Sequence, residues 1–221
     1  MHFDDGTLTL WEFEKQIKPK ITFYRSRFLQ DSIIKLRGCK PIGKLPQSKN
    51  LELFTLFDLG GSEFKCHPNE LTQLKKNHGY PQLFNPDAPI GYIGQGAIGD
   101  KNQPSIQTYL DELKLLAEKL QKKILYFPHR TEKKSIKEQL LNDKNFIYHQ
   151  SEYPLEIELI AKNIQLSTLI GNFSTVMFTC HLLYPEMPLY TVNDTHPDPI
   201  MQKILRKQLQ QISVLKFYNY F

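Results

Sequence analysis

From Ile90 onward, short apolar runs alternate with helical patterns, and this alternation restricts the possible folds more than any other feature of the sequence. In the stretch 104–120, apolar residues recur at helical spacing and fall on one face. A chain that alternates strand and helix through short connections buries its strands in a parallel sheet, so we predict a doubly wound α/β fold. The expected strands span 90–94, 123–127, 145–149, 167–170 and 187–191, and the expected helices span 104–120, 134–142, 154–163, 174–183 and 199–211.

The first eighty residues lack this regularity. They contain β-prone patches at 20–23 and 51–59, separated by turns with glycine and proline. A proline-rich passage at 81–89 is typical of a domain boundary. We therefore expect an irregular first part over 1–84, a Rossmann-like domain over 85–198, and a C-terminal helix and tail over 199–221 that packs back across the domains.

The charge and composition of the chain favour some classes of binding partner over others. The net charge is +5 and the isoelectric point is near 8.9, which is compatible with nucleic acid, an anionic membrane surface or a phosphorylated small substrate. The lysines are spread along the chain and no aromatic-basic RNA-binding motif accompanies them, which argues against nucleic acid. A hydrophobic content of 40% excludes wholesale disorder.

Cysteine use and the absence of long apolar runs point to a cytosolic protein. Cys39, Cys66 and Cys180 lie far apart and form no CxxC pair, so neither a zinc site nor a disulfide framework is indicated. We expect reduced, mostly buried thiols. No apolar run is long enough for a transmembrane helix, and the N-terminus lacks a signal-peptide pattern, so we expect a soluble, cytoplasmic chain.

The residues that follow the expected strands are the candidates for function. In doubly wound sheets the ligand crevice lies outside the carboxyl ends of the strands. Four segments reach that edge: Gly94–Asp100, Pro128–Glu132, Gln150–Glu156 and Gly171–Thr175. The glycines of the first segment do not have the GxGxxG spacing, so NAD binding is not indicated.

Each candidate side chain has a structural alternative. His129 can be a structural histidine, although its position after a strand and beside Arg130 favours a role in the crevice. Ser174 and Thr175 suit the N-cap of a helix, and the same geometry binds phosphate because free N–H groups and the helix dipole favour an anion. Glu156 is a favourable acid for a first helical turn, but a carboxylate there can also hold a ribose diol. Together these groups suit a nucleotide that carries a leaving phosphate.

Five segments give the chain a family resemblance. Phe3-Asp4-Asp5-Gly6-Thr7 resembles the acidic-acidic-glycine motif of bacterial sialyltransferases. Tyr126-Phe127-Pro128-His129-Arg130 resembles their strand followed by His-Pro, and Phe173-Ser174-Thr175 resembles their Ser-Ser/Thr motif. Ile93-Gly94-Gln95 resembles their first donor-domain strand, and Tyr153-Pro154-Leu155-Glu156 an acidic helix start. Order and spacing are similar to glycosyltransferase family 52, the lipooligosaccharide sialyltransferases, over essentially the whole chain.

The resemblance implies a GT-B fold and transfer of sialic acid from CMP-sialic acid to a terminal galactose of lipooligosaccharide. The transfer would invert the anomeric carbon and need no metal or other cofactor. His129 would assist departure of the CMP phosphate as a general acid or hydrogen-bond donor. Ser174 and Thr175 would hold that phosphate, and Glu156 the cytidine ribose. The remaining donor-side positions would be Gly94, Gln95 and Arg130.

Two carboxylates compete for the role of the base that deprotonates the acceptor hydroxyl. The family's base lies in the loop after the first donor-domain strand, where Asp100 is the nearby acid. In related sialyltransferase families the second acid of the acidic-acidic-glycine motif does this work, which makes Asp5 the rival. We place Asp100 ahead of Asp5.

The sequence also departs from the family pattern. Arg130 replaces the usual proline after the motif histidine, and an arginine can pair with phosphate in a bidentate manner. His67-Pro68 and His196-Pro197 repeat the His-Pro pair, but neither follows a recognisable strand in the right order, and we interpret both as unrelated to the motif. Family members carry more than a hundred residues before the acidic motif, so we expect residues 1–84 to be a C-terminal remnant of the acceptor-binding domain.

Three alternatives for function therefore remain open at the level of sequence. The chain is a sialyltransferase, a glycosyltransferase of the same fold with another nucleotide sugar such as UDP-glucose, or a non-catalytic nucleotide-binding remnant. The resemblance implies a place in the bacterial cytoplasm at the inner face of the inner membrane. It is compatible with peripheral membrane association and with a homodimer.

Overall fold

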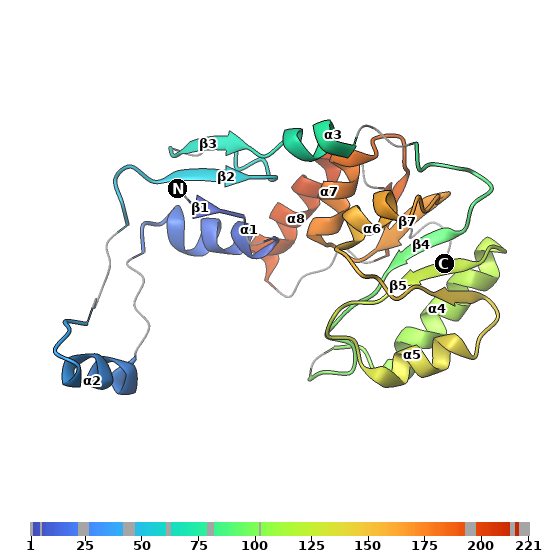
Figure 1. Ribbon diagram of the computed structural model, residues 1–221, viewed down its shortest axis with the longest axis horizontal. Helices are drawn as coiled ribbons and strands as arrows, with labels where there is room; N and C mark the ends of the chain where they lie inside the picture. Colours follow the sequence, from blue (N-terminus) through green and yellow to red (C-terminus); the bar gives the residue numbers. More distant parts are fainter. Residues whose placement is uncertain are drawn as a thin grey trace. The chain divides into compact units, whose positions relative to one another are not determined.

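The computed structural model describes residues 2–4, 6–21, 27–41, 47–60, 63–78, 82–101, 103–192, 198–212 and 215–216. Contacts group the chain into two compact units, Met1–Asn69 and Glu70–Phe221 (Figure 1). By this grouping the proline-rich passage belongs with the second, larger unit.

The smaller unit is built on a three-stranded parallel sheet in the order β1-β2-β3. Its strands are β1 (His2–Phe3), β2 (Glu52–Thr55) and β3 (Lys65–Pro68). The chain between the first two strands forms α1 (Leu8–Glu12), the π-helical turn η1 (Phe13–Ile17) and α2 (Phe28–Leu36). Leu10, Phe13 and Leu53 are buried and supply its apolar core.

One expectation for this unit is wrong. The region was expected to be irregular with β-prone patches, yet its described residues contain three short helical segments, and Lys20 lies in a turn at φ 55°. The other β-prone patch does contain β2. His67 and Pro68 are the last residues of strand β3, and the interpretation of this pair as unrelated to the motif stays a prediction. Residues 22–23 and His196-Pro197 lie outside the described residues.

The larger unit confirms the prediction of a doubly wound parallel sheet. It contains α3 (Thr72–His78) followed by six strands, all parallel, in the order β6-β5-β4-β7-β8-β9. The strands are β4 (Ile90–Ile93), β5 (Ile124–Phe127), β6 (Phe146–Tyr148), β7 (Thr168–Gly171), β8 (Leu189–Thr191) and β9 (Leu215–Lys216). The helices between them are α4 (Ile106–Leu120), α5 (Lys134–Leu141), α6 (Leu155–Ala161), α7 (Thr175–Leu183) and α8 (Pro199–Gln211).

This order is the 3-2-1-4-5-6 arrangement of dinucleotide-binding folds. Helices α4 and α5 lie on one face of the sheet, and α6 and α7 on the other (Figure 1). The chain changes direction across the sheet between β4 and β7, which pair directly through Ile90 to Ile93 and Thr168 to Gly171. Ligands of such sheets bind at the carboxyl ends of the two strands that flank this switch point. The switch point therefore lies beside the segments that begin at Gly94 and Asn172.

Local sequence explains why helix α4 forms where it does. Ser105 is the N-cap, and its hydroxyl accepts a hydrogen bond from the Thr108 N–H at 3.1 Å. Pro104 therefore precedes the cap, whereas the sequence placed it in the first turn. The helix ends at Gln121, whose φ of 51° is left-handed. The buried side chains of its inner face are Tyr109, Leu110, Leu113, Leu116 and Ala117, with Ile106 and Leu120 partly buried beside them.

Candidate functional site

Two glycines of the loop after β4 allow the neighbouring strand end to approach closely. A Cβ on Gly94 would lie 2.6 Å from the Tyr126 hydroxyl and 2.9 Å from the Phe127 carbonyl oxygen. A Cβ on Gly96 would overlap the His129 ring and the Thr131 hydroxyl. These glycines are therefore needed because the loop after β5 packs on the loop after β4, and they bring His129 to the β4 side of the crevice.

The hydrogen bonds of His129 define which ring nitrogen carries the proton. Its Nδ1 accepts a hydrogen bond from the Thr131 N–H at 3.2 Å and lies 2.8 Å from the Thr131 hydroxyl. A nitrogen that accepts from a backbone N–H carries no proton of its own, so the neutral ring is protonated at Nε2. The residue is exposed, and Nε2 has no partner among the described residues. The ring is thus held from one side and can donate from the other.

Asp100 and Lys133 connect the same two loops by charge. Lys133 Nζ lies 2.9 Å from Asp100 Oδ1, and the two side chains are 38% and 57% exposed. The pair places a carboxylate of the β4 loop beside the β5 loop. Arg130 is exposed and pairs with no described residue, and Gln95 is partly exposed with no side-chain hydrogen bond in the described part of the chain.

The start of α7 lies at the other side of the switch point. Ser174 is the N-cap, and its Oγ accepts a hydrogen bond from the Val176 N–H at 3.3 Å, which confirms the capping role expected from the sequence. Thr175 is the first helical residue. The helix dipole and the N–H groups of the first turn favour negative charge at this point. Asn172 Oδ1, two residues before the cap, is buried and has no hydrogen-bond partner among the described residues.

Glu156 lies in the first turn of α6, against α7. The Tyr184 hydroxyl donates a hydrogen bond to the Glu156 backbone carbonyl at 2.5 Å. The Glu156 side chain is partly exposed and has no hydrogen bond to any described residue. Its carboxylate is free to accept from a ligand, and its role toward a ribose stays a prediction.

The carboxylate that organises this region is Glu158, which the sequence did not single out. Its side chain is only 1% exposed. Oε1 lies 2.8 Å from His149 Nε2, and Oε2 accepts from the N–H groups of Glu152 and Tyr153 at 3.1 and 3.0 Å. Burial alone would raise the pKa of Glu158, but these hydrogen bonds lower it below its ordinary value of 4.5. Glu158 therefore fixes the loop that follows β6.

Replacing Glu158 with alanine is expected to lower the free energy of unfolding by about 2 kcal/mol at neutral pH, because His149 and two backbone N–H groups lose a buried, charged acceptor. The pKa of Glu158 is lowered in the folded chain, so its contribution is present above pH 4.5 and disappears as the pH falls below that value. Urea unfolding at several pH values measures both effects.

The matched control is Glu156→Ala in the same helical turn. It removes a carboxylate without hydrogen bonds and should cost less than about 1 kcal/mol. An equal loss for both variants, or a deficit for Glu158→Ala that grows as the pH falls below 4.5, would contradict the assigned role.

A cluster of tyrosines around Glu132 anchors the loop that carries His129. The Tyr126 and Tyr148 hydroxyls both donate to the Glu132 carboxylate, the second at 3.0 Å, and the Tyr109 and Tyr126 hydroxyls lie 3.0 Å apart. Tyr92 stacks on Tyr126 with ring centroids 5.9 Å apart. Burial raises the pKa of Glu132, and the two tyrosine hydrogen bonds partly offset this. Tyr92, Tyr126 and Tyr148 lie in expected strands and Tyr109 lies in an expected helix, but their convergence depends on the sheet order, which the sequence does not reveal.

The acidic-acidic-glycine segment can be described only in part. Asp4 Oδ2 accepts a hydrogen bond from the Leu56 N–H at 2.5 Å, which joins the end of β1 to the segment after β2. Its second oxygen, Oδ1, is buried without a partner among the described residues. Gly6 has φ 60°, which favours glycine at this turn. Asp5 lies outside the described residues, so its role as a base stays a prediction.

The structure also bears on the cysteines, on metal ligands and on membrane-spanning helices. Cys39 and Cys66 are exposed and Cys180 is buried, so the expectation of mostly buried thiols is wrong. Within the described ranges, no three His, Cys, Asp or Glu side chains gather as a metal site would require. No helix in the described part of the chain combines the length and apolar character needed to cross a bilayer.

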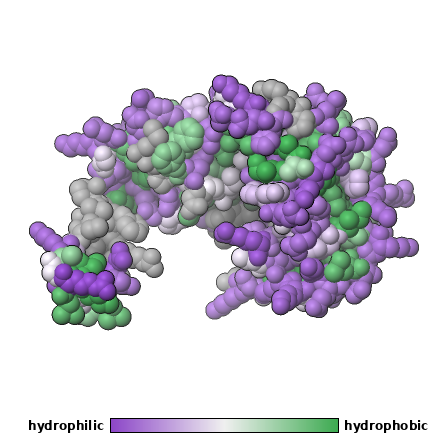
Figure 2. Space-filling model, viewed as in Figure 1, coloured by the Kyte–Doolittle hydropathy of each residue, from purple (hydrophilic) through white to green (hydrophobic). Residues whose placement is uncertain are grey.

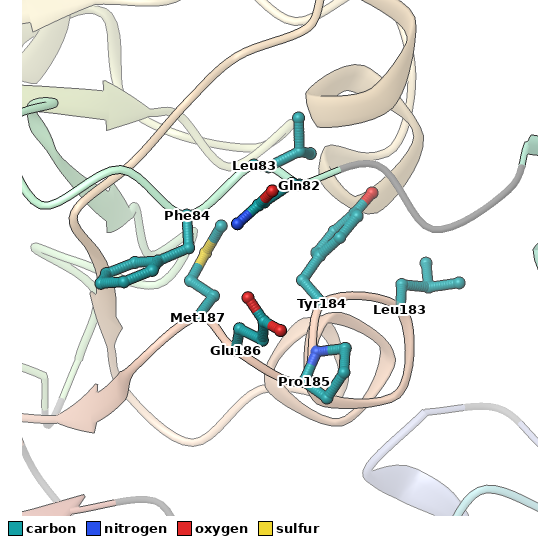
Figure 3. Close-up of a pocket in the computed structure, with 8 residues that line it drawn as sticks. All are labelled: Gln82, Leu83, Phe84, Leu183, Tyr184, Pro185, Glu186 and Met187. Atoms are coloured by element: carbon teal, nitrogen blue, oxygen red, sulfur yellow. The ribbon is translucent and has the colours of Figure 1, made fainter.

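A cavity of about 350 Å³ lies in the same unit at a different place. Leu83, Phe84, Tyr184 and Met187 contribute apolar surface to it (Figure 3). Its lining residues 183–187 lead into β8, and Leu83 accepts a hydrogen bond from the N–H of Leu166, just before β7. The cavity therefore lies near the amino ends of these strands, whereas His129 and Ser174 follow carboxyl ends. The lining contains the Glu186 carboxylate and no basic side chain, which makes it unsuited to a phosphate.

Comparisons with known proteins leave the family open. No protein-family model matches the chain, and no curated protein sequence matches it. Among solved structures, it is similar to the UDP-GlcNAc 2-epimerase of Methanocaldococcus jannaschii, at 16% sequence identity and a TM-score of 0.32. The similarity covers 64% of this chain and 42% of the epimerase, so the chain spans less than half the length of that protein. The fold class follows from the strand order itself.

Proposed function

We propose that this chain binds CMP-sialic acid at the switch point of its larger sheet and transfers sialic acid to a terminal galactose of lipooligosaccharide. The proposal is supported by one juxtaposition. An imidazole with its proton on Nε2 follows β5, and the capped start of α7 follows β7, on the two strands that flank β4. The family resemblance of the same segments supports the identity of the donor and of the acceptor.

The start of α7 suits the phosphate of CMP. The C–O bond between the sialic acid anomeric carbon and the phosphate breaks, and its electron pair stays on the phosphate oxygen. Ser174, Thr175 and the first-turn N–H groups would hold that growing charge from preorganised positions, which is an effective source of rate enhancement. Arg130 lies in the same loop as His129, is exposed, and pairs with no described residue, so its guanidinium is available to the phosphate.

His129 would act on the leaving oxygen. Its Nε2–H can donate a hydrogen bond to the phosphate oxygen as the bond breaks, while the Thr131 N–H holds Nδ1 and so fixes the ring. Of the two roles that the resemblance implies, this tautomer supports the hydrogen-bond donor. The galactose hydroxyl attacks the anomeric carbon from the opposite side and loses its proton to a carboxylate. Asp100, whose Oδ1 lies 2.9 Å from Lys133 Nζ, is the described candidate for this base.

Binding of CMP should raise the thermal midpoint of the purified chain. A ligand at about a hundred times its dissociation constant adds about 2.7 kcal/mol to stability, which corresponds to a shift on the order of 5–10 °C. Ser174→Ala should remove most of this shift because it weakens the phosphate site. The matched control is Ser105→Ala, which removes the cap of α4 and should lower the midpoint while leaving the CMP shift intact.

A panel of CMP, UDP and GDP in the same assay distinguishes the donors. A shift with UDP and none with CMP would replace the proposal by a glycosyltransferase that uses another nucleotide sugar. No shift with any of the three at millimolar concentration would refute nucleotide binding at this site.

A further inference from the structure

Helix α2 exposes a continuous apolar face. Leu29, Ile33 and Leu36 follow the i, i+4, i+7 spacing that aligns side chains on one side of a helix, and they are 71%, 50% and 86% exposed. Phe28, at 79%, extends the same face. None of the nine residues of α2 is buried. Figure 2 shows these apolar side chains gathered on the surface of this helix.

The helix is closed by its own residues. Gly38 adopts φ 74°, its N–H donates to the Lys35 carbonyl, and the Cys39 N–H donates to the Ile34 carbonyl. This is the Schellman arrangement, which ends a helix without help from other elements. The Ser32 hydroxyl, the one polar group within the apolar face, donates to the Phe28 carbonyl at 2.8 Å and so is already satisfied. The face is therefore suited to enter an apolar medium.

The segment around α2 is strongly basic. Residues 15–50 contain ten lysines and arginines and one acid, Asp31, whereas acids outnumber bases in the rest of the chain. Arg27, Lys35, Arg37 and Lys40 flank the helix, are exposed, and form no ion pair with any described residue. The surplus positive charge of the whole protein is thus concentrated where the apolar face lies.

This combination identifies the partner. A basic segment alone would suit nucleic acid, but phosphates and base edges offer nothing to four exposed large apolar side chains. A groove on another protein would suit the apolar face, but it would not require such an excess of cationic groups. An anionic lipid surface satisfies both, because acyl chains take up the apolar face while lysines and arginines meet the headgroups.

We infer that α2 is an interfacial helix that binds the surface of an anionic phospholipid bilayer through Phe28, Leu29, Ile33 and Leu36, with the flanking lysines and arginines against the headgroups. The helix lies in the plane of the interface. The inference is independent of the reaction proposed above, because it uses no residue of the larger unit.

Cosedimentation of the full chain with lipid vesicles tests it. The chain should bind vesicles of phosphatidylcholine with phosphatidylglycerol and should bind phosphatidylcholine alone at least about tenfold more weakly, with the difference decreasing as salt is added. Ile33→Glu should reduce binding about tenfold or more. Leu141→Glu, at a leucine that is 60% exposed on α5, is the matched control and should bind as the unchanged chain does.

A second pair of variants tests the charges. Lys35→Glu with Arg37→Glu should weaken binding about tenfold or more, whereas Lys203→Glu with Lys207→Glu, the same charge change on exposed positions of α8, should not. Because α2 buries no side chain, its variants should keep the fold, which circular dichroism checks. Equal binding to both kinds of vesicle, or equal binding by Ile33→Glu and Leu141→Glu, overturns the inference. A dimer that Ile33→Glu dissociates, without lipid binding, also overturns it in favour of a second copy.

Discussion

Replacing His129 with alanine should lower the rate of sialic acid transfer about 10²- to 10³-fold, because the leaving phosphate loses a preorganised hydrogen-bond donor. Affinity for CMP should change little, since the start of α7 still holds the phosphate. Single-turnover transfer from CMP-sialic acid to a lactose-terminated acceptor measures the rate, and a thermal shift measures CMP binding. A loss of both in equal proportion would indicate that His129 only binds the nucleotide.

Two further variants separate the possible roles of this ring. Thr131→Val removes the hydroxyl beside Nδ1 but keeps the backbone N–H that holds the tautomer, so it should lower the rate less than His129→Ala does. His78→Ala is the matched control. This histidine is exposed at the end of α3, and its loss should leave the rate unchanged. CMP binding without transfer by the unchanged chain would favour the non-catalytic alternative.

Gly94→Ala should be the most destabilising small substitution at the site. The added Cβ would meet the Tyr126 hydroxyl at 2.6 Å and the Phe127 carbonyl oxygen at 2.9 Å, and backbone cannot yield as a flexible side chain can. We expect a loss of about 3 kcal/mol, seen as a fall in the thermal midpoint on the order of 6–12 °C. Ala97→Val, at an exposed position of the same loop, should change stability by less than about 0.5 kcal/mol.

A double-mutant cycle identifies the cause of that loss. Tyr126→Phe removes the nearest of the three atoms that the new Cβ would meet, so Gly94→Ala should cost less in that background than in the unchanged chain. If the stability losses of the two single variants add up to that of the double variant, the contact with the Tyr126 hydroxyl is not the cause of the loss in Gly94→Ala. A cost near zero for Gly94→Ala alone would show that the two loops are not packed as described.

The elements from Ile90 to Gln211 could be predicted because periodicity and burial agree there. Strand 123–127 and helix 199–211 were expected, and the structure has Ile124–Phe127 and Pro199–Gln211. The order of the strands could not be predicted, since the pattern of a parallel strand does not reveal its neighbours. The first unit was expected to be irregular because α1 and α2 are short, and α2 has an apolar stripe that no other element covers.

The sequence predicted which residues lie at the candidate site, but it did not predict the hydrogen bonds that hold them there. His129 and Ser174 were expected at strand ends because parallel strands deliver their carboxyl ends to one edge. The partners that hold them were not predictable. The Thr131 bond to Nδ1 depends on a turn of the backbone, and Glu158 acts on N–H groups five and six residues before it. Among two nearby acids in one helix, burial distinguishes Glu158 from Glu156, and burial is a property of the folded chain.

The tyrosine cluster has a consequence for following this protein by spectroscopy. Trp11 is the chain's single tryptophan and belongs to the smaller unit, whereas Tyr92, Tyr109 and Tyr126 are packed in the core of the larger one. Fluorescence excited at the red edge of the indole band reports on the first unit. Near-ultraviolet circular dichroism from immobilised phenol rings is dominated by the second. The two units thus carry separate optical labels, and no dye needs to be attached to distinguish their melting.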